Sequence, residues 1–220
     1  MKKAVIFDLD GTLLNTLSDL AASVNFALSS CGYPTRSIDE VRRFIGNGVV
    51  MLVHRSVPSG TSEEDEKKCF NVFRAHYLEH MEDTTAPYDG VNELLLELSK
   101  RSVKTAVVSN KLDAGVKGLC EKHFPHLTCA FGVTDESERK PSPKNVFKAL
   151  SKLGVEKGDA LYVGDSEVDV ETAKNAGLEM VGVTWGYRGR DELLASGAGT
   201  TVDAPSELLA LVLKASPNSL

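Results

Sequence analysis

Six short apolar runs, separated by stretches with hydrophobic residues at helical spacing, constrain the fold of this chain most strongly. The runs are 3–9, 103–109, 129–134, 160–165, 179–184 and, more weakly, 200–203. The helical stretches are 91–100, 112–122, 143–153, 167–176, 191–196 and 206–214. Apolar runs without polar alternation are typical of strands that are buried on both faces of a parallel sheet. The alternation therefore predicts an α/β fold, a Rossmann-like parallel sheet with helices on both faces.

A long segment interrupts this alternation after the first strand. The runs 3–9 and 103–109 are separated by 93 residues, whereas a parallel crossover needs only about a dozen or somewhat more. The segment 15–86 shows two helical patterns, at 17–28 and 69–81, and no strand-like alternation. We therefore predict a core formed by residues 1–14 and 87–220, with an inserted helical cap domain at 15–86.

Charge and composition exclude several classes of protein. The 220 residues include 25 Lys and Arg against 31 Asp and Glu, a formal net charge of −6, which disfavours a protein that coats nucleic acid. Apolar windows are too short for a membrane helix, and Asp8 interrupts the first one before a signal peptide would be complete. The four scattered cysteines are interpreted as reduced thiols, which predicts a cytoplasmic protein without a membrane or nucleic-acid partner.

Cysteine and histidine recur at intervals of three in one segment. The residues are Cys120, His123, His126 and Cys129. Structural zinc sites usually take two ligands from each of two knuckles that a longer stretch separates, whereas this run is a helix end interrupted by Pro125. We interpret the spacing as accidental.

Polar residues close the predicted strands at the points where the chain leaves the sheet. In open parallel sheets, ligands bind outside the carboxyl ends of the strands, so these residues are expected to lie together. They are Asp8 and Asp10 after the first strand, Ser109 and Asn110 at the second, Asp165 and Asp169 after the fourth, and Lys140 in a loop. The sequence therefore predicts a cluster of acids with one lysine.

Such a cluster requires compensating positive charge. Asp8, Asp165 and Asp169 together would carry three negative charges, which a fold tolerates unpaired only at high cost. A divalent cation and Lys140 would balance them. Oxygen ligands without histidine or thiolate favour a hard ion, and a site for phosphate favours Mg²⁺.

Each of these residues also has a purely structural alternative. Asp8 and Asp10 belong to a tetrapeptide that is common in turns. Asp165 is a candidate helix cap, and Asp169 could pair with Ser166 in a capping box. Ser109 and Asn110 could cap the helix expected near residue 112, or they could bind phosphoryl oxygens at its N-terminus.

Four segments resemble, in order and spacing, the four motifs of the haloacid dehalogenase superfamily of phosphatases. They are Asp8-Leu9-Asp10-Gly11-Thr12, Ser109-Asn110, Lys140-Pro141, and Gly164-Asp165-Ser166 through Asp169. The resemblance implies that Asp8 attacks phosphorus to form an aspartyl-phosphate, and that Asp10 protonates the leaving alcohol and then activates water. It implies Mg²⁺ bound by Asp8, the Asp10 carbonyl and Asp165, with Asp169 in support. Lys140 and Ser109 would steady the phosphoryl group, and we expect Thr12 and Asn110 to contact the substrate as well.

The cap is expected to select the substrate. Phe44-Ile45-Gly46-Asn47-Gly48, followed by a helix that carries Arg55, resembles the specificity loop of phosphoglycolate phosphatases. Gly46, Asn47 and Gly48 would let backbone approach the ligand, and Arg55 could pair with its second anionic group. The structural alternative is an interhelical turn with an exposed arginine.

These residues predict a phosphatase that acts on a small phosphorylated metabolite, with 2-phosphoglycolate as the leading substrate. Within the same superfamily, a pyrophosphatase, a 5′-nucleotidase and a sugar phosphomutase are the alternatives. A non-catalytic binding scaffold is the alternative from a different class.

Overall fold

The computed structural model describes residues 1–46 and 48–214. The contacts within the chain divide it into two compact units. The core unit contains residues 1–14 and the chain from Pro87 onward, and the cap unit is Asn15–Ala86. Within the described residues, no helix combines the length and the apolar character that crossing a membrane requires.

The core unit is built on a six-stranded parallel sheet, which confirms the predicted fold class. Its strands are β1 (Ala4–Phe7), β4 (Lys104–Leu112), β5 (Cys129–Val133), β6 (Ala160–Gly164), β7 (Glu179–Val183) and β8 (Thr200–Val202), in the order β5-β4-β1-β6-β7-β8. β1 lies between β4 and β6, and all four of its residues are fully buried. The chain builds the sheet outward from β1 first on one side and then on the other. The carboxyl end of β1 is therefore the switch point at which α/β sheets bind ligands.

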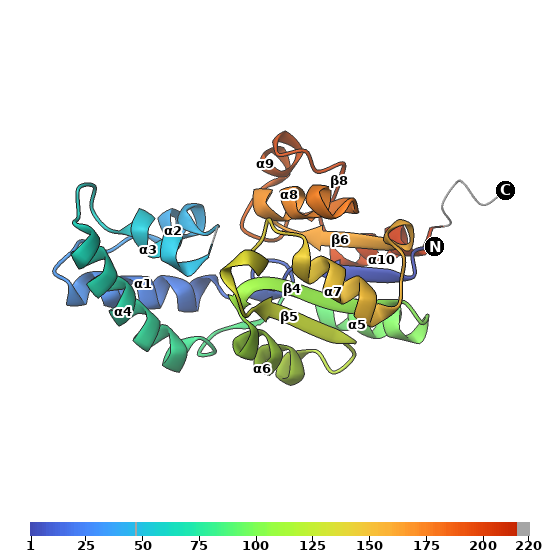
Figure 1. The fold of residues 1–220 in the computed structure, drawn as a ribbon, viewed down its shortest axis with the longest axis horizontal. Helices are drawn as coiled ribbons and strands as arrows, with labels where there is room; N and C mark the ends of the chain where they lie inside the picture. Colours follow the sequence, from blue (N-terminus) through green and yellow to red (C-terminus); the bar gives the residue numbers. More distant parts are fainter. Residues whose placement is uncertain (47, 215–220) are drawn as a thin grey trace. The chain divides into compact units, whose positions relative to one another are not determined.

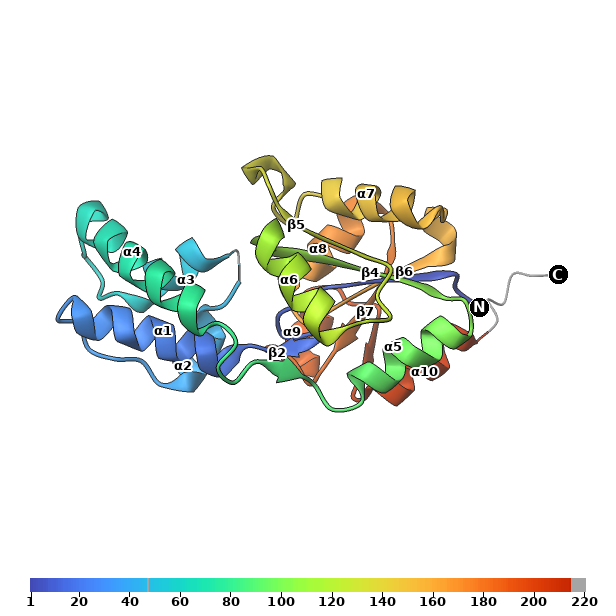
Figure 2. The ribbon, with the colours of Figure 1, turned by 90° about the horizontal axis from the view of Figure 1, so that it is seen from below.

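Helices cover both faces of this sheet (Figures 1 and 2). They are α5 (Val91–Lys100), α6 (Asp113–His123), α7 (Lys144–Leu153), α8 (Glu167–Ala176), α9 (Arg190–Ala195) and α10 (Pro205–Leu213). α7 and α8 pack on one face against a cluster that includes Ile6 and Tyr162. Figure 2 shows α5 and α10 side by side on the other face. The two layers bury the sheet, which explains its apolar strands.

One element boundary differs from the expectation in a way that affects the site, and smaller differences surround α7. β4 continues to Leu112, three residues beyond the apolar run, because its pairing with β5 resumes at Leu112 after a register shift that follows Val108. Two short helical turns, η1 (Glu136–Glu138) and η2 (Lys157–Asp159), flank α7 in the chain. α7 itself begins at Lys144, one residue after the predicted start.

The cap unit is helical, with α1 (Leu17–Ser30), α2 (Ile38–Phe44), α3 (Val49–Ser56) and α4 (Glu63–His80). α1 and α4 form its most extensive helix pair and bury the predicted apolar stripe of α1 together with Phe73 of α4. Where the chain passes between the units, β2 (Leu14–Asn15) and β3 (Ala86–Pro87) pair as a two-stranded ribbon. The sequence showed no signal for this ribbon, because each strand is only two residues long.

Candidate active site

The first motif forms a tight turn directly after β1. The Leu13 and Leu14 amides both donate to the Leu9 carbonyl, and the Gly11 amide donates to the Leu14 carbonyl. Gly11 has a φ of 87°, a conformation that favours glycine. The turn separates the side chains of Asp8 and Asp10, so that Asp8 is buried whereas Asp10 is partly exposed.

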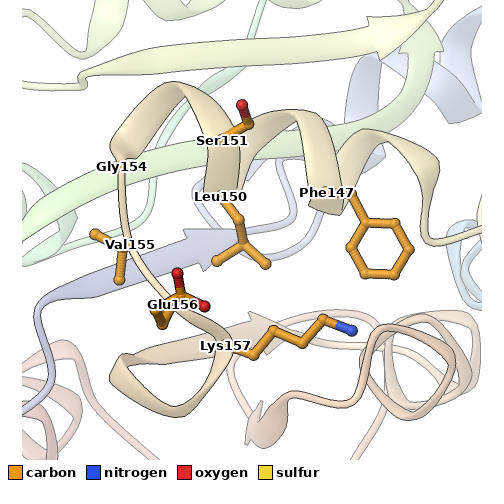
Figure 3. Close-up of a pocket in the computed structure, with 7 residues that line it drawn as sticks. All are labelled: Phe147, Leu150, Ser151, Gly154, Val155, Glu156 and Lys157. Atoms are coloured by element: carbon orange, nitrogen blue, oxygen red, sulfur yellow. The ribbon is translucent and has the colours of Figure 1, made fainter.

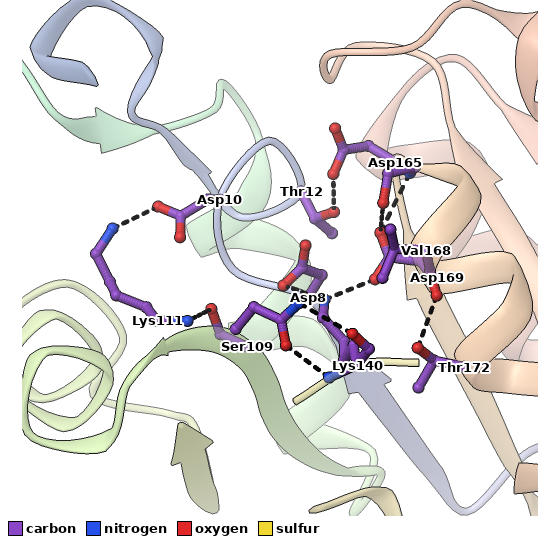
Figure 4. Close-up of polar contacts among 12 residues, drawn as sticks. Asp8, Asp10, Thr12, Ser109, Lys111, Lys140, Asp165, Val168, Asp169 and Thr172 are labelled. Carbon is purple, nitrogen blue, oxygen red and sulfur yellow. Dashed lines mark hydrogen bonds and ion pairs between the residues drawn. The ribbon is translucent and has the colours of Figure 1, made fainter. Parts of the chain in front are cut away.

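Lys140 lies between two carboxylates (Figure 4). Its Nζ is 2.8 Å from Oδ1 of Asp8 and 2.7 Å from Oδ1 of Asp169. Asp169 also accepts hydrogen bonds from the Tyr162 hydroxyl, at 3.2 Å, and from the backbone and hydroxyl of Ser166. The capping interaction with Ser166 and membership of the acid cluster therefore coexist in Asp169.

Asp165 is held by two donors from distant parts of the chain. The Thr12 hydroxyl donates to Oδ1 at 2.9 Å, and the Tyr187 amide donates to Oδ2 at 2.8 Å. The cap of α8 is Ser166, so the alternative that Asp165 caps this helix is wrong. Thr12 contacts an acid of the cluster directly.

The segment 185–187 supports this arrangement, and none of the sequence motifs predicts its role. A Cβ on Gly186 would overlap the Gly11 carbonyl oxygen and the Asp165 side chain. The Trp185 indole donates to the Thr12 carbonyl at 3.0 Å. The segment therefore packs directly on the first motif. The Trp-Gly-Tyr sequence after the fifth strand was the available signal, but nothing local indicates its partner.

The three acids Asp8, Asp165 and Asp169 form a site that fits a divalent cation. One carboxylate oxygen from each lies within 4.8 Å of the others, and all three residues are buried. Burial raises the pKa of Asp8 well above its usual range, and Lys140 offsets only part of this effect. Burial, together with the charge of Asp169, raises the pKa of Asp165 to about 7. An all-oxygen site with excess negative charge suits Mg²⁺.

The second lysine of the site was not predicted. Lys111, in β4, places its Nζ 2.8 Å from Oδ1 of Asp10 (Figure 4). The side chains are 13% and 22% exposed, respectively. The available sequence signal was a lysine next to Ser109-Asn110. Because the strand was predicted to end at residue 109, Lys111 was not expected to lie at the site.

Ser109 and Asn110 lie within β4 and not at a helix terminus. α6 starts at Asp113, after Leu112. Both the capping alternative and the placement of these residues at a helix N-terminus are therefore wrong, because the strand continues past them. The Asn110 side chain instead exchanges hydrogen bonds with the backbone of Lys140, accepting from its amide at 2.7 Å. Ser109 is buried and accepts a hydrogen bond from the Lys111 amide.

The predicted cap residues lie around the start of α3. Gly46 and Gly48 have φ angles of 134° and 87°, and Gly48 precedes the helix. Asn47 lies outside the described residues. Arg55 donates from Nη1 to the carbonyl oxygens of Phe44, at 2.8 Å, and Gly46, at 3.3 Å. In the cap unit, Arg55 therefore anchors the loop that precedes α3.

Two other features lie apart from the acid cluster. All four cysteines are free thiols, and Cys120, His123, His126 and Cys129 do not form a metal-ligating group in the described part of the chain. A pocket of about 320 Å³ is lined by residues of α7 and of the connection to β6 (Figure 3), which are Phe147, Leu150, Ser151, Gly154, Val155, Glu156 and Lys157. It lies where the chain enters β6, at the end of the strand opposite to Asp165. It shares no residue with the site.

Sequence and fold comparisons agree on the family. The profile of the haloacid dehalogenase-like hydrolases matches residues 5–183. The phosphoglycolate phosphatase of Vibrio parahaemolyticus is 34% identical over 218 residues, with 96% of each chain covered. That of Aquifex aeolicus is 34% identical over 212 residues, again with 96% of each chain covered.

Solved structures give the same result. A crystal structure from Lactobacillus delbrueckii subsp. bulgaricus superposes with a TM-score of 0.93 at 31% identity, covering 98% of this chain and 100% of that chain. A predicted phosphoglycolate phosphatase from Haemophilus somnus gives 0.86 at 30% identity, covering 96% and 97%. The chain belongs to the haloacid dehalogenase-like hydrolase family, as the motifs indicated. Within that family it is a phosphatase, a phosphoric monoester hydrolase.

Proposed function

We propose that this protein is a Mg²⁺-dependent phosphatase that hydrolyses 2-phosphoglycolate through an aspartyl-phosphate intermediate. The observation that carries the proposal is the convergence of the buried carboxylates of Asp8, Asp165 and Asp169 around Lys140. Such a cluster provides a nucleophile, ligands for a cation and a fixed positive charge at one place. A binding scaffold would gain nothing from this costly arrangement.

Asp8 is the nucleophile in this mechanism. One of its carboxylate oxygens attacks phosphorus, and the bond from phosphorus to the ester oxygen breaks. The leaving oxygen takes a proton from the Asp10 carboxyl group. Asp10 then accepts a proton from water, whose oxygen attacks phosphorus and releases the Asp8 carboxylate. The two roles require different surroundings, which the turn between Asp8 and Asp10 provides.

The other residues position these groups. Asp8, the Asp10 carbonyl and Asp165 would hold Mg²⁺, with Asp169 in support. When bound, the cation would supply charge stabilisation for the transferring phosphoryl group. Lys140 holds Asp8 and carries a charge for the phosphoryl oxygens, and the Ser109 hydroxyl is available to bind one of them. Asn110 fixes the loop that carries Lys140.

The substrate is inferred from the relatives and from the cap. The Vibrio and Aquifex proteins are phosphoglycolate phosphatases that match this chain over nearly its full length. In the cap, Gly46, Gly48 and the N-terminus of α3 are proposed as backbone contacts for the substrate. The free thiols and the lack of a membrane-spanning helix among the described residues support a cytoplasmic location.

A panel of phosphate esters tests this proposal. The purified protein is assayed with 2-phosphoglycolate, pyrophosphate, a nucleoside monophosphate and a hexose phosphate, with Mg²⁺ and with chelator. We expect the highest kcat/KM for 2-phosphoglycolate and no turnover with chelator. Asp8→Asn should abolish turnover and covalent phosphate incorporation. Turnover by Asp8→Asn would reject the covalent mechanism, and a higher kcat/KM for another ester would reject the substrate.

A further inference from the structure

Lys111 contacts an acid of the site but takes no part in the phosphoryl transfer proposed for Asp8 and Asp10. Its ammonium lies 2.8 Å from Oδ1 of Asp10, within the core unit. The side chain of Lys140, in contrast, is 4% exposed and forms ion pairs with both Asp8 and Asp169. The site therefore has one enclosed lysine at the nucleophile and a second, more accessible lysine at the proton donor.

The backbone around Lys111 is held in a fixed position. Its amide donates to the Ser109 hydroxyl at 3.2 Å. On the neighbouring strand, a Cβ on Gly132 would come within 2.7 Å of the Lys111 carbonyl oxygen, so the two backbones are in close contact. The register of β4 with β5 shifts between Val108 and Leu112, and such irregularities re-aim side chains at the edge of a site. The position of Lys111 is therefore set by the sheet.

The chemistry of the leaving group places an anion near this lysine. The leaving oxygen must come within about 2.6–3.2 Å of the Asp10 carboxyl group for proton transfer. In 2-phosphoglycolate, a single methylene carbon separates that oxygen from the carboxylate. The carboxylate must then lie close to Asp10, where it would meet the negative charge of the acids. An ammonium group can hold several acceptors at once and would remove this repulsion.

We propose that Lys111 is a specificity-determining residue that binds the carboxylate of the substrate's leaving group. The inference rests on the proposed phosphatase function and defines the substrate class more narrowly. The class is phosphomonoesters whose leaving alcohol carries a carboxylate one carbon from the ester oxygen. Lys111 bridges this carboxylate and Asp10, so that selection of the substrate and orientation of the proton donor use the same side chain.

Binding of two matched, non-hydrolysable phosphonates tests the proposal. 3-Phosphonopropionate replaces the ester oxygen of 2-phosphoglycolate by a methylene group, and propylphosphonate has a methyl group in place of the carboxylate. Calorimetry with Mg²⁺ present compares wild type, Lys111→Met and Lys111→Arg. We expect Lys111→Met to raise the Kd of 3-phosphonopropionate about 10- to 100-fold. This is the range expected when a hydrogen bond between charged groups is lost. Propylphosphonate should change by less than about threefold, and Lys111→Arg should restore part of the loss.

Lys148→Met is the matched control. Lys148 also contacts a carboxylate, that of Glu138 at 2.6 Å, but neither residue contacts the acid cluster. This variant should bind both phosphonates as wild type does. Steady-state kinetics give a second measurement, because a lost carboxylate contact raises KM for 2-phosphoglycolate more than it lowers kcat.

The outcomes separate the two proposals. Equal losses of affinity for both phosphonates in Lys111→Met would overturn the carboxylate role and leave Lys111 as a support for Asp10. A fall in kcat alone, for both 2-phosphoglycolate and 2-hydroxyethyl phosphate, would have the same meaning. Unchanged affinity for 3-phosphonopropionate would also overturn the carboxylate role. If wild type prefers 3-phosphonopropionate and Lys111→Met keeps that preference, only the role of Lys111 fails. If wild type binds the two phosphonates equally well, the proposed substrate and the proposed role of Lys111 both fail.

Discussion

The ammonium of Lys140 lies 2.8 Å from Oδ1 of Asp8, and both side chains are nearly inaccessible to solvent. Lys140 also contacts Asp169, and the charges of these two acids raise its pKa well above its usual range despite the opposing effect of burial. This lysine therefore stays charged. When all three carboxylates are ionised, as ligands of a metal must be, they and the ammonium carry a net charge of −2, which one Mg²⁺ ion would balance.

Replacement of Lys140 by methionine should lower both the free energy of unfolding and kcat. Loss of one partner of a buried ion pair leaves an uncompensated charge and typically costs about 3–5 kcal/mol. We expect the free energy of unfolding, measured with denaturant, to fall by about this amount, and kcat to fall by more than about a hundredfold. The double variant Lys140→Met/Asp169→Asn has one fewer unpaired acid, so it should regain stability without regaining activity. A Lys140→Met variant as stable as wild type would contradict the compensation argument.

The pH dependence of the metal-free protein follows from the raised pKa values of Asp165 and Asp8. Asp165 shows the direction. Its pKa is raised to about 7 in the folded protein, against about 3.9 in an unfolded chain. Between these values the folded state holds a proton that the unfolded chain has released. The free energy of unfolding should therefore decrease as pH rises from about 5 to 7, and the decrease persists above pH 7. Thermal unfolding in chelator at several pH values measures it.

Asp165→Asn and Mg²⁺ complete this test. Burial lowers the pKa of His76 in the cap, which contributes the opposite pH dependence near pH 6. The difference between wild type and Asp165→Asn removes the contribution of His76 and measures that of the acid cluster, because the charge of Asp165 also raises the pKa of Asp8. We expect the variant to be more stable than wild type at pH 8 in chelator. Mg²⁺ should stabilise wild type more at pH 8 than at pH 5.5, because at the lower pH it must displace protons. A wild-type advantage over the variant at pH 8 in chelator would contradict this account.

Local sequence signals predicted most of the fold. All six strands and all six helices of the core follow the apolar runs and helical stretches closely, because buried parallel strands and amphipathic helices leave direct patterns. The C-terminal end of β4 and the ribbon formed by β2 and β3 were not predictable in this way. Leu112 belongs to β4 through its pairing with Val133 after a register shift, and this pairing depends on a segment elsewhere in the chain.

The candidate site was predictable only in part, for a similar reason. Asp8, Lys140, Asp165 and Asp169 were found because they belong to spaced motifs. Asp8 and Asp165 directly follow strands, Asp169 lies in the first turn of α8, and Lys140 lies in a loop. The contact of Lys111 with Asp10 spans 101 positions, and that of Tyr187 with Asp165 spans 22. Such contacts depend on which strands are neighbours and on where a loop returns, and a single sequence does not contain this information in local form.

Substitution of Gly186 by alanine should disturb the acid cluster. An added Cβ would overlap the Gly11 carbonyl oxygen and the Asp165 side chain, and overpacking of this kind typically costs about 1–3 kcal/mol. Asp165 must move to relieve the overlap, so we expect weaker Mg²⁺ binding and a lower kcat. Gly199→Ala is the control, because a Cβ there meets no atom within 4 Å. Calorimetric titration with Mg²⁺ measures the effect, and equal affinities in the two variants would show that Gly186 does not position Asp165.

The last prediction concerns Asp19 in the cap, a buried acid in the first turn of α1. Its carboxylate accepts hydrogen bonds from the backbone and hydroxyl groups of both Thr84 and Thr85. Burial alone would raise its pKa, but these hydrogen bonds outweigh burial and lower it. Asp19 therefore contributes stability above about pH 4, and this contribution is lost as pH falls through the folded-state pKa.

Asp19→Asn replaces a charged acceptor of four donors by a neutral amide, which should destabilise the protein by about 1–3 kcal/mol at pH 7. Asp39→Asn is the matched control, since the side chain of Asp39 is 71% exposed and its loss should change stability by less than about 0.5 kcal/mol. Hydrogen exchange should show faster exchange at the Thr84 and Thr85 amides in Asp19→Asn only. Unchanged protection of these amides would mean that other contacts hold this end of the cap, and that Asp19 is dispensable there.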